Sequence, residues 1–363
     1  MKKISLLLQL FGLLPMLVAC SDDSETTPFP PEPVPPVISQ AWILNQGAYY
    51  YGIASTMDAL HLSTGNYVRG VFADVNQQSI GDNAIDGVQH GSKLYVAMYG
   101  SDLVWVLDRR TLSIVSQIPT NDPEGICAEG GSVYVSNNDG FVSRIDTTTL
   151  QVDRRIEVGP NPAHLTTANG YLYVSISDGY NYDGGYANGY RVGKINLKTF
   201  VKEKDIRVGV NPGPICADAS GTIFVVSRGD YASVRPQVYR IDKDDSVHSF
   251  CEASHIAVKG HTLYAMLNHT DWSSTPAVST LKWATYDTRT SVESPLELTQ
   301  VPESPIDIDV DPVSGEFYVG SNASSFDYTS PGYVYRYQSD GVLVARYEAG
   351  VAPCAVIFGH GSE

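Results

Sequence analysis

The chain has 363 residues, of which 18% are charged and 43% are hydrophobic. The charged fraction lies below the ~25% of an average soluble domain while the apolar content is ordinary, which excludes a disordered chain and a membrane bundle. The formal net charge is −16, and so acidic a chain repels phosphate backbones, so we expect no nucleic-acid partner. The 32 Gly, 21 Pro and 23 Tyr favour strands and turns over helices.

The first segment, residues 1–20, has the pattern of a secretory signal: two lysines, a short apolar run, and Ala19 before Cys20. Its end resembles the bacterial lipobox, in which the cysteine is lipidated and becomes the first residue of the mature protein. The resemblance implies that Cys20 is the lipidation site and that a lipid anchor is the protein's contact with the membrane. A plain signal peptide followed by a chance cysteine is the alternative. Without Lys2 and Lys3, 22 basic residues face 40 acidic ones, a net charge of −18.

Residues 21–38 are expected to form a tether. Its acidic start, Ser21 to Glu25, resembles the export signal with which gut bacteria of the Bacteroides type move lipoproteins to the outer face of the outer membrane. The proline-rich remainder favours polyproline geometry at ~3.1 Å per residue, so the tether spans roughly 50 Å. The folded part, residues 39–363, would then be held away from the outer membrane at the cell surface.

A strand centred on an aromatic residue recurs along the folded part. The first three central residues follow one another at intervals of 39, and each copy is preceded by a turn with an apolar stretch and followed by further short strands. The central residues are Tyr95, Tyr134, Tyr173, Phe224, Tyr264 and Tyr318, with Trp42 in a looser seventh copy. Four short strands per ~40 residues, repeated about seven times, predict an all-β fold, a seven-bladed β-propeller.

The two ends of the folded part are expected to meet in one blade. Residues 350–358 repeat the pattern of a first strand, and no further blade follows them. We therefore predict that this C-terminal strand is the innermost strand of the blade begun by residues 41–47 and closes the ring.

The turns between strands resemble those of a known family of propellers. The segment from Ile145 to Thr149 has the IxDxxT-type turn found in YncE-like propellers, which are exported seven-bladed proteins. The resemblance covers residues 40–360. It implies the fold and leaves the ligand open, because one fold hosts many functions.

Most of the candidate site residues come from long inserts. We expect all the extra length of the longer repeats to lie between the second and third strands of the blades, and hence at one end of the propeller. Aromatic residues interleaved with Asn, Asp and Ser are typical of binding surfaces, although loops also tolerate insertions without any function. In blades two and three the corresponding loops are short, and they contribute Tyr99 and Asn138. The candidate ligand-binding residues in the long inserts are Tyr49, Tyr50, Tyr51, Asp178, Tyr180, Tyr182, Tyr186, Tyr190, Arg228, Asp230, Tyr231, Asp271, Trp272, Asn322, Phe326 and Tyr328.

Three further candidate ligand-binding residues, Asp86, His164 and His255, lie about ten residues before a central aromatic and are expected to line the channel mouth. The equivalent positions elsewhere hold Gly125, Pro214 and Asp307. Two Asp and two His around one axis raise the question of a metal, but no paired-ligand spacing accompanies them, and we predict none.

Catalytic motifs are absent from the sequence. It contains no G-x-S-x-G elbow, no HExxH and no P-loop, so we predict no catalytic residue and no enzymatic activity. A metal-dependent, lactonase-like propeller enzyme is the minority alternative.

Four cysteines follow Cys20, namely Cys127, Cys216, Cys251 and Cys354. An even number in an exported protein suggests disulfides. Cys127 and Cys216 occupy equivalent places two repeats apart, however, which favours buried free thiols. Both states stay open on the sequence alone.

The lipobox, the acidic export signal, the sequence ILNQG at residues 43–47 and the YncE-like blades together resemble the BtuG-like proteins of Bacteroides-type bacteria. Those proteins capture cobalamin and related corrinoids and pass them to an outer-membrane TonB-dependent transporter. The resemblance implies a surface lipoprotein with a corrinoid ligand, no cofactor, and such a transporter as its partner. A glycan- or peptide-binding accessory protein is the main alternative.

Overall fold

The computed structural model describes residues 39–271, 275 and 278–360. The predicted signal segment, the tether with Cys20, and the candidate Trp272 lie outside the described residues. The chain divides into two units, Met1–Pro36 and Val37–Glu363, and every strand named below belongs to the second.

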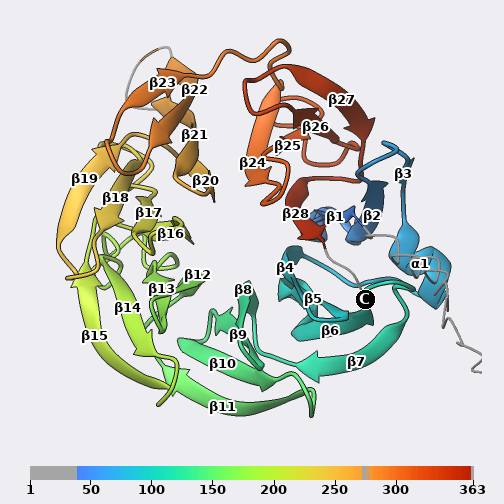
Figure 1. Ribbon diagram of the computed structural model, residues 1–363, viewed down its shortest axis with the longest axis horizontal. Helices are drawn as coiled ribbons and strands as arrows, with labels where there is room; N and C mark the ends of the chain where they lie inside the picture. Colours follow the sequence, from blue (N-terminus) through green and yellow to red (C-terminus); the bar gives the residue numbers. More distant parts are fainter. Residues whose placement is uncertain (1–38, 272–274, 276–277, 361–363) are drawn as a thin grey trace, which may run out of the picture. The chain divides into compact units, whose positions relative to one another are not determined.

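Seven four-stranded antiparallel sheets form the blades of a β-propeller (Figure 1). The innermost strands of neighbouring blades contact one another all the way around the ring. The structure thus confirms the predicted all-β, seven-bladed fold.

The first four blades, each from its innermost to its outermost strand, have the following bounds. Blade one is β28 (Pro353–Gly359), β1 (Gln40–Asn45), β2 (Thr56–His61) and β3 (Tyr67–Val68). Blade two is β4 (Ala84–His90), β5 (Lys93–Met98), β6 (Leu103–Asp108) and β7 (Ile114–Pro119). Blade three is β8 (Pro123–Glu129), β9 (Ser132–Asn137), β10 (Phe141–Asp146) and β11 (Gln151–Glu157). Blade four is β12 (Pro162–Ala168), β13 (Tyr171–Ile176), β14 (Arg191–Asn196) and β15 (Val201–Arg207).

The remaining three blades follow the same order. Blade five is β16 (Pro212–Ala217), β17 (Ile223–Ser227), β18 (Gln237–Ile241) and β19 (Val247–Cys251). Blade six is β20 (His255–Lys259), β21 (Thr262–Asp271), β22 (Val278–Asp287) and β23 (Glu293–Pro295). Blade seven is β24 (Ser304–Val310), β25 (Phe317–Asn322), β26 (Tyr333–Tyr337) and β27 (Leu343–Glu348).

The hydrophobic core consists of seven clusters, one between each pair of neighbouring blades. The recurring aromatic of each second strand belongs to this core: Trp42 and Tyr95 are fully buried, and Tyr134 is only 4% exposed. A blade has two apolar faces that it cannot cover alone, so stacking in a ring buries both. The outer strands alternate instead between exposed and half-buried residues, as in β11.

The turns between the third and fourth strands explain the repeated IxDxxT pattern. The Asp146 carboxylate accepts the backbone N–H groups of Thr148 and Thr149, at 2.9 and 2.7 Å, and Leu150 then adopts a left-handed conformation. Asp108 makes the same contacts with Arg110 and Thr111. A side chain that satisfies two backbone donors favours a tight turn at that point, so the motif encodes the hairpin locally.

The C-terminal strand closes the ring as predicted. Strand β28 pairs with β1 in antiparallel register, with Ala41 opposite Phe358 and Ile43 opposite Val356. Just beyond β28, His360 Nε2 lies 2.6 Å from an Asp311 carboxylate oxygen after β24. These contacts tie the last part of the described chain to both its first strand and blade seven.

The prediction that all extra length lies between second and third strands was wrong. In the first repeat, much of it lies in the link between β3 and β4, which holds the helix α1 (Val71–Asn76). Strand β3 has only two residues, and α1 buries Val71 and Phe72 beside it. The centroids of the Phe72 and Trp105 rings are 5.5 Å apart. The helix thus covers core that a full-length outer strand would otherwise cover.

Candidate functional site

One end of the propeller gathers two sets of loops. The loops between second and third strands and the links from each outer strand to the next blade emerge there, because the strands of every blade alternate in direction. Three adjoining cavities open among these loops and along the inner strands. We call them the mouth cavity, the side cavity and the channel cavity.

The mouth cavity has a volume of about 330 Å³ and is lined by four tyrosines. Tyr50 comes from the short 3-10 helix η1 (Tyr49–Tyr51), Tyr99 from η2 (Tyr99–Ser101), and Tyr180 and Tyr231 from the inserts of blades four and five. The hydroxyl groups of Tyr99 and Tyr180 are hydrogen-bonded to each other, and Asn138 Nδ2 donates to the Tyr180 hydroxyl at 3.1 Å. The structure thus brings together candidate residues that are far apart in sequence.

Side-chain amides from the links between blades complete the mouth cavity. Asn83, Asn161 and Asn211 line it, and each has a left-handed conformation directly before an inner strand. Asparagine tolerates this conformation better than most residues. Asn161 Oδ1 accepts the backbone N–H of Tyr180 at 3.2 Å, so the amide also positions the tyrosine. Sequence reasoning missed these residues, although the repeated Asn-Pro dipeptides at 161–162 and 211–212 were a usable signal.

The side cavity, of about 380 Å³, continues from the mouth cavity between blades five and six. It shares Arg228 and Tyr231 with the mouth cavity and adds His255, Asn268 and His269. Asn268 Nδ2 donates to the Pro305 carbonyl at 2.9 Å. The predicted Arg228 and His255 thus lie together, while Asn268 and His269 are additions that only the structure reveals.

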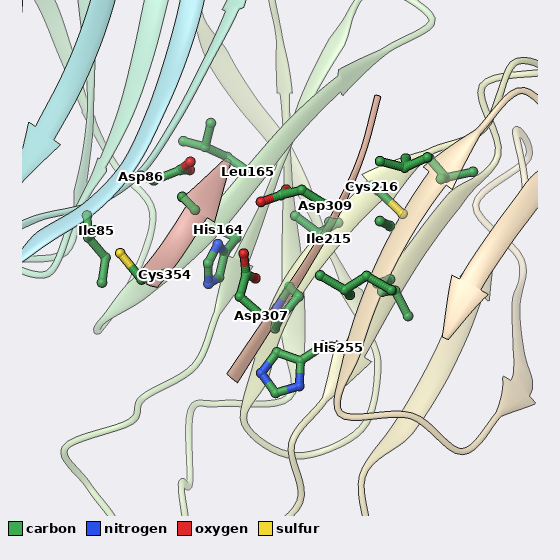
Figure 2. A pocket seen from close by; sticks show the side chains of 17 residues that line it. Ile85, Asp86, His164, Leu165, Ile215, Cys216, His255, Asp307, Asp309 and Cys354 are labelled. Atoms are coloured by element: carbon green, nitrogen blue, oxygen red, sulfur yellow. The ribbon is translucent and has the colours of Figure 1, made fainter. Parts of the chain in front are cut away.

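The channel cavity, of about 300 Å³, lies among the inner strands (Figure 2). Of the residues expected at the channel mouth, it holds Asp86, His164, Pro214, His255 and Asp307, while Gly125 is not among its lining residues. Asp309, Cys216 and Cys354 also line it. The sequence signal for Asp309 was its place two residues after Asp307 on an inner strand, since alternate residues of a strand share a face.

Burial keeps the charge of the channel cavity low. It raises the pKa of Asp86 to about 7, although Gly87 N and Ile126 N donate to this carboxylate at 2.7 and 3.1 Å. Burial raises the pKa of Asp307 well above its ordinary value, and the neighbouring Asp309 raises it further. The pKa of Asp309 is raised by burial as well, while Val356 N donates to it at 2.6 Å. Ionising several of these carboxylates together is therefore unfavourable.

The two histidines of the channel cavity are uncharged at neutral pH. Burial and the charge of Arg228 lower the pKa of His164 to about 3 and that of His255 to about 4. Arg228 Nη2 lies 3.4 Å from His164 Nε2, and the Ser254 hydroxyl lies 3.0 Å from His255 Nδ1. Both imidazoles thus act as neutral polar groups.

Several predicted residues lie away from the three cavities, inside their own loops. Asp178 and Tyr186 are buried in the insert of blade four; the Asp178 carboxylate accepts Asn181 Nδ2 and the backbone N–H of Asn188, both at 2.9 Å. The carboxylate of Asp230 accepts the N–H groups of its own loop, including that of Ala232 at 2.9 Å. These groups organise the inserts rather than face the cavities.

The other predicted residues are spread over the surface. Tyr49, Tyr51 and Tyr182 are exposed without lining a cavity described above. Tyr190 lies in a separate groove with Arg207, whose guanidinium carbon is 5.1 Å from the centre of its ring. In blade seven, Asn322 is buried, while Phe326 and Tyr328 are exposed. Asp271 ends strand β21.

The described residues hold no group of three or more His, Cys, Asp or Glu side chains arranged to bind a metal ion. Cys127, Cys216, Cys251 and Cys354 are free thiols, and burial raises the pKa of each one. Within the part of the chain that the structure describes, no helix is long and apolar enough to cross a membrane.

Similarity to known proteins is found among solved structures. No protein-family model matches the chain, and no characterised protein matches it by sequence. Among solved structures, hydrazine synthase of Kuenenia stuttgartiensis is similar with a TM-score of 0.60 and 18% identity, over 76% of this chain and 89% of that one.

Two further solved structures are similar at lower identity. The computationally designed protein Ika8 has a TM-score of 0.55 and 9% identity, over 83% of this chain and 85% of its own. A chain of the mitotic checkpoint complex has a TM-score of 0.54 and 11% identity, over 73% and 80%. At such low identity these likenesses show a shared fold alone, and the seven four-stranded sheets show that this fold is a β-propeller.

Proposed function

We propose that this protein captures a small-molecule nutrient in the mouth and side cavities, and that the nutrient is a corrinoid such as cobalamin. The observation that carries the proposal is the convergence of four tyrosines from the loops of four separate blades with three asparagine amides at one end of the propeller. Tyrosines supply large, rigid contact area at low entropic cost, and amides supply adaptable hydrogen bonds.

A corrinoid suits this surface on chemical grounds. It is bulky and rigid and carries many amide groups, which can exchange hydrogen bonds with Asn83 and donate to the remaining lone pair of Asn161 Oδ1, while its flat faces can pack on Tyr180 and Tyr231. Tyr180 is 65% exposed and Tyr231 57%, so both have area left to bury against a ligand. A single aromatic anchor of this kind contributes about 2 kcal/mol, roughly a thirtyfold change in Kd.

The proposal includes the cell-surface location and the onward path of the ligand. Its support is the resemblance of residues 1–38 to a lipoprotein signal and tether, with Cys20 as the lipidation site. A lipid-anchored head of this kind would hand its ligand to a TonB-dependent transporter in the same outer membrane. Replacing Cys20 by alanine should release the protein from the membrane fraction, and retention there would contradict this part of the proposal.

Binding can be tested with residues 21–363, since the second unit forms a closed ring with its own core. We expect the red colour of cyanocobalamin to co-elute with this protein on a sizing column. Tyr180→Ala should weaken binding by about tenfold or more, as measured by calorimetry. Tyr182→Ala is the matched control, because Tyr182 lies in the same insert and is equally exposed, at 66%, but lines none of the three cavities.

No retention of cyanocobalamin at micromolar concentration would overturn the corrinoid proposal. The same tyrosines also suit sugar rings, so the variants should in that case be run through affinity gels containing soluble polysaccharides. Retardation of the wild type but not of Tyr180→Ala would favour a glycan-binding protein.

A further inference from the structure

Arg228 is the basic residue at the junction of two of the three cavities. It lines both the mouth cavity and the side cavity, at the point where they meet. Among the described residues that line these cavities and the channel cavity, it is the sole lysine or arginine. An arginine in this position, in a protein of net charge −16, requires a physical explanation.

No carboxylate of the described residues forms an ion pair with Arg228. Its hydrogen-bond partner is the neutral imidazole of His164, 3.4 Å away. Asp230, two residues along, directs its carboxylate to its own loop. Burial raises the pKa of Glu124, and the nearby charge of Arg228 opposes that rise. The Glu124 carboxylate accepts Asn138 Nδ2 at 3.5 Å. The guanidinium therefore keeps hydrogen-bonding capacity for a ligand.

The surrounding backbone is shaped to hold the guanidinium. A Cβ atom at Gly213 would lie 2.6 Å from Arg228 Nε and 2.7 Å from Nη1, so the side chain packs against a glycine that leaves room for it. His164 fixes the other end. An arginine in such a position presents a fork of N–H donors that matches the geometry of a carboxylate or phosphate.

We propose that Arg228 binds an oxyanion, a carboxylate or phosphate group, of the captured ligand, while the tyrosines of the mouth cavity pack on its ring system. The inference deepens the proposed function, because it rests on the same cavities and names the chemistry of the ligand. Among the described residues no carboxylate lies within ion-pair distance of this half-buried guanidinium, and an oxyanion from the ligand offsets the cost of burying it. Cobalamin meets this requirement through its phosphodiester, and cobinamide, which lacks the nucleotide loop, does not.

The test uses residues 21–363 and three small probes in isothermal titration calorimetry: phenyl phosphate, benzoate and the neutral benzamide. We expect one or both anions to bind at least tenfold more tightly than benzamide, and the preferred anion distinguishes phosphate from carboxylate recognition. Arg228→Gln should remove this preference, since a charge-assisted hydrogen bond accounts for a tenfold or larger change in affinity.

Two further variants separate the loss of the Arg228 contact from misfolding and from a general loss of positive charge. Gly213→Ala displaces the guanidinium without removing its charge and should also abolish the preference, which decides the question if Arg228→Gln fails to fold. Arg235→Gln is the matched control, because Arg235 lies in the same insert, pairs with Glu252 at 3.2 Å and lines none of the three cavities. It should leave the preference unchanged.

Equal affinity for anionic and neutral probes in the wild type would overturn the inference, and so would an anion preference that survives both Arg228→Gln and Gly213→Ala. Its failure is distinguishable from that of the proposed function. If cyanocobalamin and dicyanocobinamide bind equally well and Arg228→Gln changes neither Kd, the corrinoid proposal stands and the oxyanion inference falls. If neither corrinoid binds but phenyl phosphate binds through Arg228, the reverse holds.

Discussion

Replacing Gly359 by alanine is expected to weaken the closure of the ring. Gly359 is the last residue of β28 and pairs with Gln40 of β1. A Cβ atom there would lie 2.6 Å from both Cη2 and Cζ3 of the Trp42 ring. Trp42 is fully buried, and its indole is rigid, so ring and strand must separate by about 0.8 Å to reach ordinary contact at 3.4 Å.

Such overpacking of a core costs about 1–3 kcal/mol. With an unfolding entropy of about 2.1 cal/mol/K per residue over about 320 residues, the melting temperature should fall by roughly 1.5–4.5 °C. The matched control is Gly193→Ala in β14, another buried strand glycine, whose added Cβ would have its nearest neighbours at 3.4–3.8 Å. There the substitution should raise stability by about 0.4–1 kcal/mol, because alanine restricts the unfolded chain.

The assay is urea and thermal unfolding of both variants and of a double-mutant cycle with Trp42→Phe. The smaller ring lacks the two clashing atoms, so the double variant should be more stable than the sum of the single effects predicts. A Gly359→Ala protein as stable as Gly193→Ala, or a cycle without coupling, would refute the account of the closing contact.

Three further outcomes are expected. Truncation before Val351 removes β28 and leaves one edge of β1 without a hydrogen-bonded neighbour, so the truncated protein should be lost to aggregation or proteolysis. An unchanged melting temperature would contradict ring closure. The raised pKa of Asp86, about 7, means that the folded state favours the protonated carboxyl. Its stabilising effect is present below the ordinary pKa and is lost as pH rises through 7, by an amount on the order of a few kcal/mol. The urea midpoint should therefore fall between about pH 4 and 7 more steeply in the wild type than in Asp86→Asn, and equal slopes over that range would exclude this cause. Because burial raises the pKa of their thiols, the four described cysteines should react slowly with a thiol reagent in the native protein and quickly in guanidinium. Rapid native labelling of Cys127, Cys216 or Cys354 would show that the inner strands open readily.

The repeat in the sequence was sufficient to predict the fold. Each blade depends on short-range features that recur in every copy, namely a buried aromatic such as Tyr95, a turn held by a carboxylate such as Asp146, and alternating apolar residues. Because these features act over a few residues, they can be recognised without knowing which segments meet. The helix α1 was missed, since its six residues are held by contacts with the core of blades one and two rather than by a strong local helix pattern.

The candidate site was predicted only at the level of its loops. Tyr180 and Tyr182 are two residues apart and chemically identical, yet one lines the mouth cavity and the other does not. That choice depends on Tyr99 and Asn138, which lie in other blades. Likewise, Arg228 and Asp230 share a loop, but only the arginine faces the cavities.

The sequence by itself determined the number of blades, the closing strand and the end of the propeller at which aromatic residues gather, because hydrophobic periodicity and turn chemistry are local. The tertiary structure alone decided which side chains meet there. It assembled the asparagine amides from separate links between blades, and it placed Arg228 of blade five beside His164 of blade four. Such contacts join residues from different blades, and their geometry follows from the closed ring rather than from any one repeat.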